Sequence, residues 1–368
     1  MNRERLLIYP YTKENLSLIQ YIVLHMNQYE VSSVVSPNGW GLVGKDVGEV
    51  VYREKMNLIV ESDYDASLKK CDTVLFCDYD NEGLNIKQVI YKMEVAIQNG
   101  KNIISFIELS EDVIEELEQK SKKYGVKIYS YSNKYKFQIE KNEIKNIALS
   151  DIESAVIFVM GISENTRKFE LQLSLKEHFI KDGYNVLSIS SRNYGDFFGM
   201  TPIPDFMFQT KYTEDEKIVL FNQFVKKQER KQKPDVIIIG VPGGIIPISK
   251  KFHNRFGMMA YEIAQAVSPD TTVLCTHFNY FDKMYFENIS PTMKYKYNAE
   301  PDCFLVNNTV VDFINDDIQG DLSFIEVDFS KVEAVIKQAY NKDTFIYCDD
   351  IYYKIKNTLE EYAQVDSI

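Results

Sequence analysis

The residues best suited to chemistry lie at positions 161–168, where the chain reads GISENTRK. An apolar run stops at Gly161, six mostly polar residues intervene, and Lys168 opens a stretch with helical spacing. Between a strand and a helix, such a loop binds phosphate because backbone N–H groups converge at the helix N-terminus and a lysine reaches the outer phosphates. We therefore predict a nucleotide- or phosphate-binding loop. Its predicted members are Gly161, Ser163, Glu164, Asn165, Thr166, Arg167 and Lys168.

The spacing fits the longer form of a phosphate loop, G-x-x-x-x-x-G-K-T, with two departures. Arg167 stands where the second glycine belongs, and Phe169 replaces the hydroxyl residue that holds magnesium. Arg167 either offers its guanidinium fork to phosphate oxygens or obstructs the space that a glycine leaves open. ATP or GTP is the predicted cofactor, and magnesium has the least support. An ordinary strand-loop-helix turn is the alternative interpretation.

A second glycine-rich segment reads VIIIGVPGGIIP at positions 236–247. An apolar run leads into Gly243 and Gly244, which we add to the predicted phosphate site. Residues 155–280 resemble dethiobiotin synthetase-like P-loop proteins, in which an E-G-A-G-G-type loop follows a long-form phosphate loop at a comparable distance. The resemblance implies that the two loops form one crevice and that the acidic residue helps to bind magnesium. That acidic position is Gly240 here, so a second magnesium contact is missing.

The whole chain resembles a small group of bacterial peptide maturation system proteins, which are encoded beside ribosomally made natural-product peptides. The segments that carry this resemblance are GISENTRKFELQLSLKE, GYNVLSISSRNYGDFFG, PDVIIIGVPGGIIP and NRFGMMAYEIAQAVSPD. It implies a cytoplasmic accessory protein in the maturation of such a peptide, with the precursor peptide or a modifying enzyme as partner. The alternative is a non-catalytic scaffold that keeps the P-loop fold and recruits either partner. The resemblance implies a pathway and no particular reaction, so enzymatic activity is left open.

A possible substrate loop reads SSRNYGDFFGMTPIPDF at residues 190–206. It follows the strand that we expect beside the phosphate loop, and its candidate binding residues are Arg192, Asn193 and Asp196. Asp196 is also a candidate for a surviving acidic magnesium contact, with a turn cap as the other interpretation. The alternative for the whole segment is an irregular connector whose aromatic side chains pack into the core.

Other acidic and metal-ligating side chains give weaker signals. The three groups are Asp78, Asp80 and Glu82; Cys275 and His277; and Asp349 and Asp350. The first group has the spacing to hold a cation, but a cap for the next helix is the favoured interpretation. The second pair would share one face of a strand, yet the sequence offers no second ligand pair. The third pair is interpreted as a helix cap, and no metal site is predicted.

The elements that must position these residues begin with an alternation of short apolar runs and helical patterns. The runs predict strands at 6–10, 31–35, 58–60, 73–77, 102–107 and 126–130, and helices at 13–27, 83–98 and 111–124. Asn99-Gly100 and Gly125 are typical helix stops. This alternation predicts a Rossmann-like parallel sheet covered on both faces. YPYTKEN follows the first strand where G-x-G-x-x-G would be needed, so a dinucleotide cofactor is disfavoured.

The alternation resumes after a polar stretch at 131–150, and we place the domain boundary near residue 145. Strands are predicted at 155–161, 185–191, 234–240, 271–278, 303–308, 324–329 and 345–350, and helices at 168–182, 214–232, 256–267, 330–341 and the C-terminus. The predicted fold is α/β, with a Rossmann-like domain at 1–145 and a divergent P-loop-type domain at 146–368.

Composition limits the partners. The chain has 368 residues, a hydrophobic share of 45% and a net charge of −12, which argues against nucleic acid or an anionic membrane as partner. No stretch approaches the length of a membrane helix, and the N-terminus lacks the apolar core of a signal peptide. The basic run at 226–233 is interpreted as a solvated helix end. The five scattered cysteines indicate reduced thiols in a cytoplasm. The oligomeric state is left open.

Overall fold

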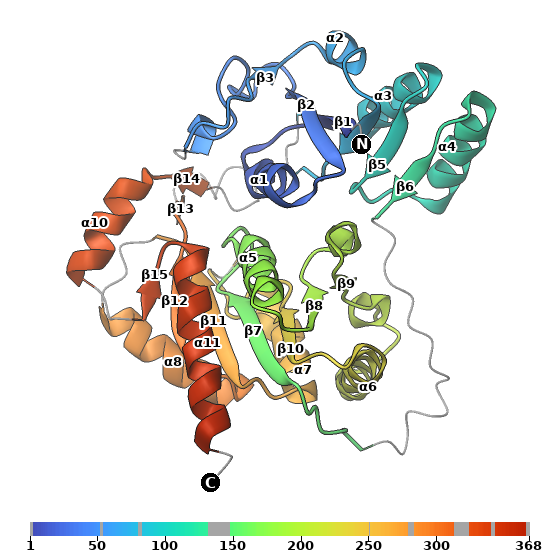
Figure 1. The fold of residues 1–368 in the computed structure, drawn as a ribbon. Helices are drawn as coiled ribbons and strands as arrows, with labels where there is room; N and C mark the ends of the chain where they lie inside the picture. Colours follow the sequence, from blue (N-terminus) through green and yellow to red (C-terminus); the bar gives the residue numbers. More distant parts are fainter. Residues whose placement is uncertain are drawn as a thin grey trace. The chain divides into compact units, whose positions relative to one another are not determined.

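The computed structural model describes residues 3–51, 54–79, 83–131, 148–249, 251–278, 283–312, 324–339 and 343–365. The chain divides into two compact units, Met1–Asn133 and Lys134–Ile368, each with its own parallel sheet (Figure 1). The predicted boundary near residue 145 falls within 132–147, outside the described residues.

The first unit is built on a six-stranded parallel sheet with the order β3-β2-β1-β4-β5-β6. Its strands are β1 (Glu4–Tyr9), β2 (Tyr29–Val35), β3 (Val60–Glu61), β4 (Thr73–Phe76), β5 (Asn102–Ser105) and β6 (Ile128–Ser130). This is the strand order of a Rossmann sheet, which reverses its direction of winding between β1 and β4. All six predicted strands are present, and the unit is Rossmann-like.

Four α-helices connect these strands in the described part of the unit. They are α1 (Leu16–His25), α2 (Tyr64–Leu68), α3 (Ile86–Gln98) and α4 (Glu111–Tyr124). Gly125 ends α4 in the left-handed conformation, as its position predicted. The first helix is shorter than predicted because Lys13–Asn15 forms a separate 3-10 turn. Helix α2 escaped prediction because five residues are too few to show helical periodicity.

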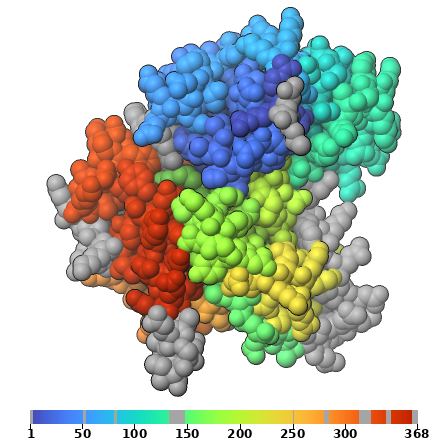
Figure 2. Space-filling view, viewed as in Figure 1, coloured from blue at the N-terminus to red at the C-terminus, as the bar shows by residue number. Residues whose placement is uncertain are grey.

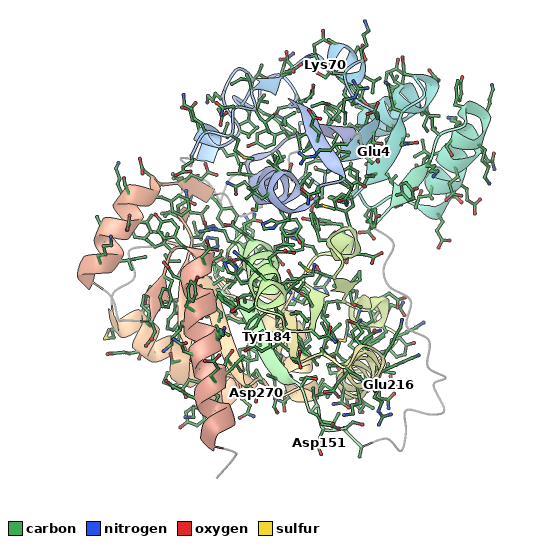
Figure 3. The ribbon with its side chains drawn as sticks, viewed as in Figure 1. Glu4, Lys70, Asp151, Tyr184, Glu216 and Asp270 are labelled. Atoms are coloured by element: carbon green, nitrogen blue, oxygen red, sulfur yellow. The ribbon has the colours of Figure 1, made fainter. Side chains whose placement is uncertain are left out.

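Glu4, labelled in Figure 3, connects the starts of three neighbouring strands. Its carboxylate accepts hydrogen bonds from Thr73 Oγ1 in β4 and from Asn102 Nδ2 in β5, the latter at 3.4 Å. Beside it, Arg5 Nη2 lies 2.7 Å from Asp72 Oδ1. Because these side chains come from successive strands, their contacts align β1, β4 and β5.

The second unit contains a seven-stranded parallel sheet with the order β15-β12-β11-β7-β10-β8-β9. Its strands are β7 (Ala155–Gly161), β8 (Val186–Ser190), β9 (Thr201–Pro202), β10 (Val236–Gly240), β11 (Thr271–Thr276), β12 (Cys303–Val306) and β15 (Thr344–Phe345). A separate antiparallel pair is formed by β13 (Thr309–Val311) and β14 (Phe324–Glu326). The fold class is α/β, as predicted, with a Rossmann-like domain followed by a second α/β domain built on a parallel sheet.

Helices cover both faces of this second sheet (Figure 1). They are α5 (Lys168–Lys181), α6 (Glu214–Gln232), α7 (Met258–Ala266), α8 (Lys283–Tyr297), α10 (Phe329–Ala339) and α11 (Cys348–Val365). Along β7, Phe158 and Met160 pack in one core with α6, α7 and α8, while Ile157 and Val159 pack in the other with α5 and α11. Because both faces of the sheet are buried at β7 and β10, the sequences of these two strands are unbroken apolar runs.

The end of the second unit differs from prediction. The apolar run at 345–350 was predicted to be one strand, but β15 ends at Phe345 and α11 begins at Cys348. Asp349 and Asp350 therefore lie in the first turn of α11, where carboxylates interact favourably with the helix dipole. Figure 2 shows α11, in red, lying against the light-green surface of the segment that contains α5.

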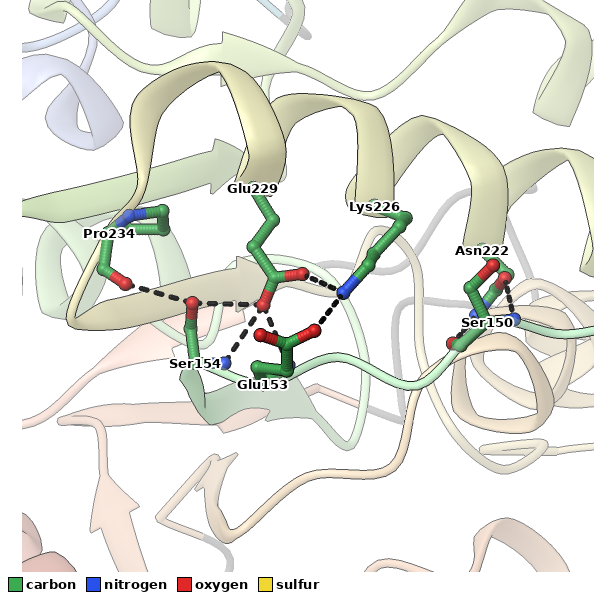
Figure 4. A network of polar contacts seen from close by, with 7 residues as sticks. All are labelled: Ser150, Glu153, Ser154, Asn222, Lys226, Glu229 and Pro234. Atoms are coloured by element: carbon green, nitrogen blue, oxygen red, sulfur yellow. Dashed lines mark hydrogen bonds and ion pairs between the residues drawn. The ribbon is translucent and has the colours of Figure 1, made fainter.

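A polar network fixes the start of β7 against α6 (Figure 4). Glu229 Oε1 accepts the backbone N–H groups of Glu153 at 2.7 Å and Ser154 at 2.9 Å, while Glu229 Oε2 accepts from Lys226 Nζ at 2.7 Å. Lys226 and Glu229 are both buried. The predicted solvated helix end at 226–233 is thus wrong for these residues, because their charges pair with each other and anchor the sheet.

We predict that Glu229→Ala lowers the free energy of unfolding by about 2–4 kcal/mol, because it leaves two backbone N–H groups without their acceptor and leaves the Lys226 ammonium group with Glu153 alone. Denaturant unfolding followed by circular dichroism measures this. Arg230→Ala, at an exposed position on the same helix, is the control and should change stability by less than about 0.5 kcal/mol. Equal effects of the two substitutions would contradict an anchoring role.

Other expectations concern the chain as a whole. All five cysteines are buried. In the described ranges, no three His, Cys, Asp or Glu side chains come together in a way that suits a metal ion. None of the described helices combines the length and apolar character that a bilayer crossing requires.

Candidate phosphate-binding site

The predicted phosphate loop lies where the sequence placed it, between the end of β7 at Gly161 and the start of α5 at Lys168. A side chain at Gly161 would put its Cβ 2.5 Å from Thr166 Oγ1 and 2.7 Å from Lys168 Cδ. Only glycine therefore allows the loop to fold back over the end of the strand. The loop is also tied to the neighbouring strand β11, because Ile162 N–H donates to the Cys275 carbonyl at 2.9 Å.

Arg167 has a backbone conformation that favours glycine. Its φ of 65° and ψ of 19° are left-handed, which costs a non-glycine residue about 1–2 kcal/mol. Its guanidinium donates from Nε to Glu170 Oε2 and from Nη1 to the Ile346 carbonyl, both at 2.9 Å. The guanidinium group is thus bound to α5 and to the segment before α11. Arg167 would therefore contribute its backbone, and not its guanidinium group, to an anion site.

Lys168 brings the two predicted loops together. Its buried side chain extends to the second glycine-rich loop, where Nζ donates to the Gly243 carbonyl. Burial lowers the pKa of Lys168, and Glu164, whose Oε2 lies 3.7 Å from Nζ, opposes that shift. Gly244 packs closely against the phosphate loop, since a Cβ there would lie 2.6 Å from the Ile162 carbonyl oxygen. The site therefore contains a desolvated cation at a helix N-terminus.

The position of the missing acidic residue is physically filled. A Cβ on Gly240 would lie 2.0 Å from Gln172 Oε1, because the buried Gln172 amide occupies that space. Gln172 Nε2 donates to the Ile189 carbonyl at 2.8 Å, and its Oε1 accepts from Ser191 N–H at 3.0 Å. The amide thus joins α5 to the end of β8, in place of a magnesium ligand.

Phe169, at the usual hydroxyl position, belongs to an aromatic cluster. Its ring centroid lies 5.4 Å from that of Tyr194 and 5.5 Å from that of Phe198, both in T-shaped contacts. Tyr194, Phe197 and Phe198 are buried and belong to a 3-10 helix, η4 (Asn193–Phe198). The aromatic residues of the predicted substrate loop therefore pack into the core, which was the alternative interpretation.

The three predicted substrate-loop residues have different surroundings. Arg192 lies near enough to Glu164 and Lys168 for its charge to act on both. Asn193 is half-buried at the start of η4. Asp196 is exposed and makes no hydrogen bond or ion pair with the phosphate loop within the part of the chain that the structure describes. Among the described residues, Arg192 is the member of the three whose charge acts on the phosphate loop.

A buried chain of hydrogen bonds connects the phosphate loop to His277, Thr309 and Asn307. Asn307 Nδ2 can only donate, so it donates to Thr309 Oγ1 at 2.8 Å, and Thr309 in turn donates to His277 Nδ1 at 2.7 Å. The one hydroxyl hydrogen of Ser163 goes to the Glu164 carbonyl, 2.9 Å from Oγ, so Ser163 Oγ accepts from His277 Nε2 at 2.6 Å, which assigns the imidazole hydrogen to Nε2. His277 is therefore a neutral donor and does not serve as a base toward Ser163.

The remaining loop residues are held by backbone contacts. Asn307 Nδ2 also donates to the Asn165 carbonyl at 2.9 Å, and Thr166 Oγ1 donates to the Ser163 carbonyl at 3.2 Å. Asn165 has a φ of 56°, so the loop contains a second left-handed residue besides Arg167. The loop is thus rigidly shaped before any ligand arrives.

Sequence reasoning missed Gln172, His277 and Asn307. The spacing of Cys275 and His277 did draw attention to the histidine, but as a metal ligand and not as a support for Ser163. At the weaker acidic site, Asn85 caps α3 through its side chain, which accepts from Lys87 N–H at 2.9 Å. Residues 80–82, including Asp80 and Glu82, lie outside the described residues.

Comparison with protein-family models gives no match, and comparison with curated proteins gives none. Among solved structures, a DUF1611 family protein from Anabaena variabilis superimposes with a TM-score of 0.57 at 12% identity, over 83% of this chain and 88% of its own. An amine dehydrogenase from Mycobacterium smegmatis gives 0.29 at 14% identity, over 34% of this chain and 38% of its own. A scyllo-inositol dehydrogenase from Lactobacillus casei gives 0.27 at 12%, over 60% and 56%. The first similarity shows a shared fold, and the dehydrogenase scores are too low to support any conclusion.

The environment of His277 predicts a pH dependence of stability. Burial lowers its pKa to about 4, against 6.5 for an exposed histidine. Between these values the unfolded chain takes up a proton that the folded chain does not, so this residue makes the unfolding free energy fall as the pH falls. One proton over this window corresponds to about 3 kcal/mol.

His277→Gln removes that titration, so we expect its destabilisation relative to the wild type to be largest above pH 7 and to shrink toward pH 4. Unfolding free energies measured in denaturant at several pH values test this. A difference between His277→Gln and wild type that is constant with pH would contradict the neutral, buried assignment.

Gly240→Ala should destabilise the second unit by about 1–3 kcal/mol, because the new methyl group displaces Gln172 from its hydrogen bonds. In a Gln172→Ala background the same substitution meets no amide and should cost much less. A double-mutant cycle in denaturant unfolding measures this coupling. Additive effects would show that Gln172 does not block position 240.

Proposed function

We propose that this protein is a cytoplasmic accessory factor in the maturation of a ribosomally made natural-product peptide, and that its phosphate loop binds a nucleotide or a related anion. The sequence resemblance supports the pathway, and the site geometry supports the ligand class. The observation that carries the ligand class is Lys168. Its ammonium group is buried at the N-terminus of α5 and reaches across to the second glycine-rich loop.

The chemistry of this arrangement favours phosphate. A desolvated ammonium group attracts an anion more strongly than one in water, because the local dielectric is low. The first turn of α5 adds backbone N–H groups and the positive end of the helix dipole. Arg192 adds a second positive charge near the same loop. ATP or GTP is the proposed ligand, since a triphosphate offers the most acceptor oxygens to these donors.

The same site gives no support to magnesium-dependent phosphoryl transfer. Phe169 and Gly240 lack the oxygen atoms that would bind the metal, and the space in front of Gly240 holds the Gln172 amide. Binding without turnover is therefore the proposed role of the nucleotide. It would set the conformation in which the protein meets its precursor peptide or modifying enzyme.

A non-catalytic scaffold is the second candidate function. It is favoured by the Phe169 cluster and by Gln172, because both convert ligand positions into packing contacts. In this reading the protein recruits the precursor peptide or a modifying enzyme with no need of nucleotide. Capture of the peptide by immobilised protein, with and without ATP, separates the two functions.

We predict that Lys168→Met weakens nucleotide binding about tenfold or more, because it replaces the buried charge with an apolar chain of similar length. Titration calorimetry with ATP and GTP measures this, and chelation of magnesium should leave wild-type affinity unchanged. Lys181→Met, at the exposed end of the same helix, is the control. If neither nucleotide binds the wild type and peptide capture is unaffected, the scaffold function replaces the nucleotide proposal.

A further inference from the structure

The phosphate loop contains an anion of its own. Glu164 lies four residues before Lys168, and its Oε2 is 3.7 Å from the Lys168 ammonium nitrogen. The two side chains differ in their surroundings, since 54% of the Glu164 side chain is exposed but only 6% of the Lys168 side chain. The buried cation is thus faced by a carboxylate that has a path into water.

Several donors of an anion site act on this carboxylate. The charge of Lys168 lowers the pKa of Glu164, and the charge of Arg192 and a hydrogen bond from the Gly243 N–H lower it further. Glu164 is therefore ionised at neutral pH. Two cations and a glycine-loop amide are the groups that would surround a phosphate, so the carboxylate satisfies the same donors.

We infer that Glu164 is a resident competitor for the anion site, and that a phosphate ligand enters only by displacing its carboxylate. This inference rests on the proposed phosphate-binding function. Two anions beside one ammonium group repel each other, so the carboxylate and a phosphate do not share the site. Displacement is feasible because the exposed side chain turns into water without moving the rigid loop backbone, which His277 and Asn307 hold through Ser163 and Asn165.

This competition selects the class of ligand. A monoanionic carboxylate offers no more than Glu164 already supplies, and it loses the entropic advantage of a group attached to the loop. A dianionic phosphate brings more charge and a third acceptor oxygen, so it can replace Glu164 with a gain. The site therefore discriminates against free carboxylates and small monoanions, and it admits phosphorylated ligands.

Titration calorimetry without magnesium tests this with two probes, ATP and sodium tripolyphosphate, on wild-type protein and on Glu164→Gln. We expect Glu164→Gln to bind both probes about five- to twentyfold more tightly, because the competing charge is gone. The difference should shrink between about 0.05 M and about 0.25 M NaCl, since salt screens the repulsion. Glu360→Gln on α11 changes the charge equally at an exposed position and should bind as the wild type does.

The possible results separate the two claims. Equal or weaker binding by Glu164→Gln, when the wild type binds, overturns the competition and leaves the phosphate site intact. Tighter binding, or binding by the variant alone, supports it. If neither protein binds either probe, the phosphate site and the competition both fail. Should Glu164→Gln melt well below the wild type, Glu164→Asp decides, because its shorter carboxylate reaches less far and should tighten binding; unchanged affinity would overturn the inference.

Discussion

A buried ammonium group needs hydrogen-bond acceptors or it loses its charge. In the second unit, the need of Lys168 for acceptors determines how the residues around it are arranged. Its acceptors come from the Gly243 carbonyl and from Glu164. The Lys168 side chain passes so close to Gly161 that a Cβ there has no room. Gly243 is within reach because β7 and β10 are adjacent parallel strands, with Gly240 paired to Val159. Strand order thus determines that the two glycine-rich loops share one lysine.

The departures from a magnesium-dependent phosphate site follow from close packing. Protein interiors are close-packed and contain few voids, and a buried polar group needs a hydrogen-bond partner. Where magnesium contacts are absent from the sequence, the Phe169 ring packs on η4 and the Gln172 amide bonds to the end of β8. The Phe169 ring has its packing partners and the Gln172 amide has its hydrogen-bond partners, so the loop keeps its shape. The loop therefore keeps a geometry suited to binding an anion but lacks the side chains that would bind magnesium.

Local signals were sufficient for the elements and for the ends of the loop. The apolar run to Gly161 and the helical spacing from Lys168 each depend on neighbours within a few residues, so β7 and α5 were predictable. The contacts of Arg167 with Ile346 and of Ser163 with His277 join residues 179 and 114 positions apart. Such pairs leave no periodic trace in a single sequence. The direction of the Arg167 guanidinium and the role of His277 therefore required the structure.

The contacts between Arg167 and the C-terminal part of the chain have a consequence for folding during synthesis on the ribosome. The guanidinium donates to the Ile346 carbonyl and lies 5.4 Å from the ring of Phe329, both in parts of the chain made long after the loop itself. Chains emerge from the ribosome N-terminus first, so β7 and α5 are available well before these partners. The nascent loop acquires these contacts only when Phe329 and Ile346 have been made. A ribosome-bound chain that stops short of them carries the whole sequence motif but an unfinished site.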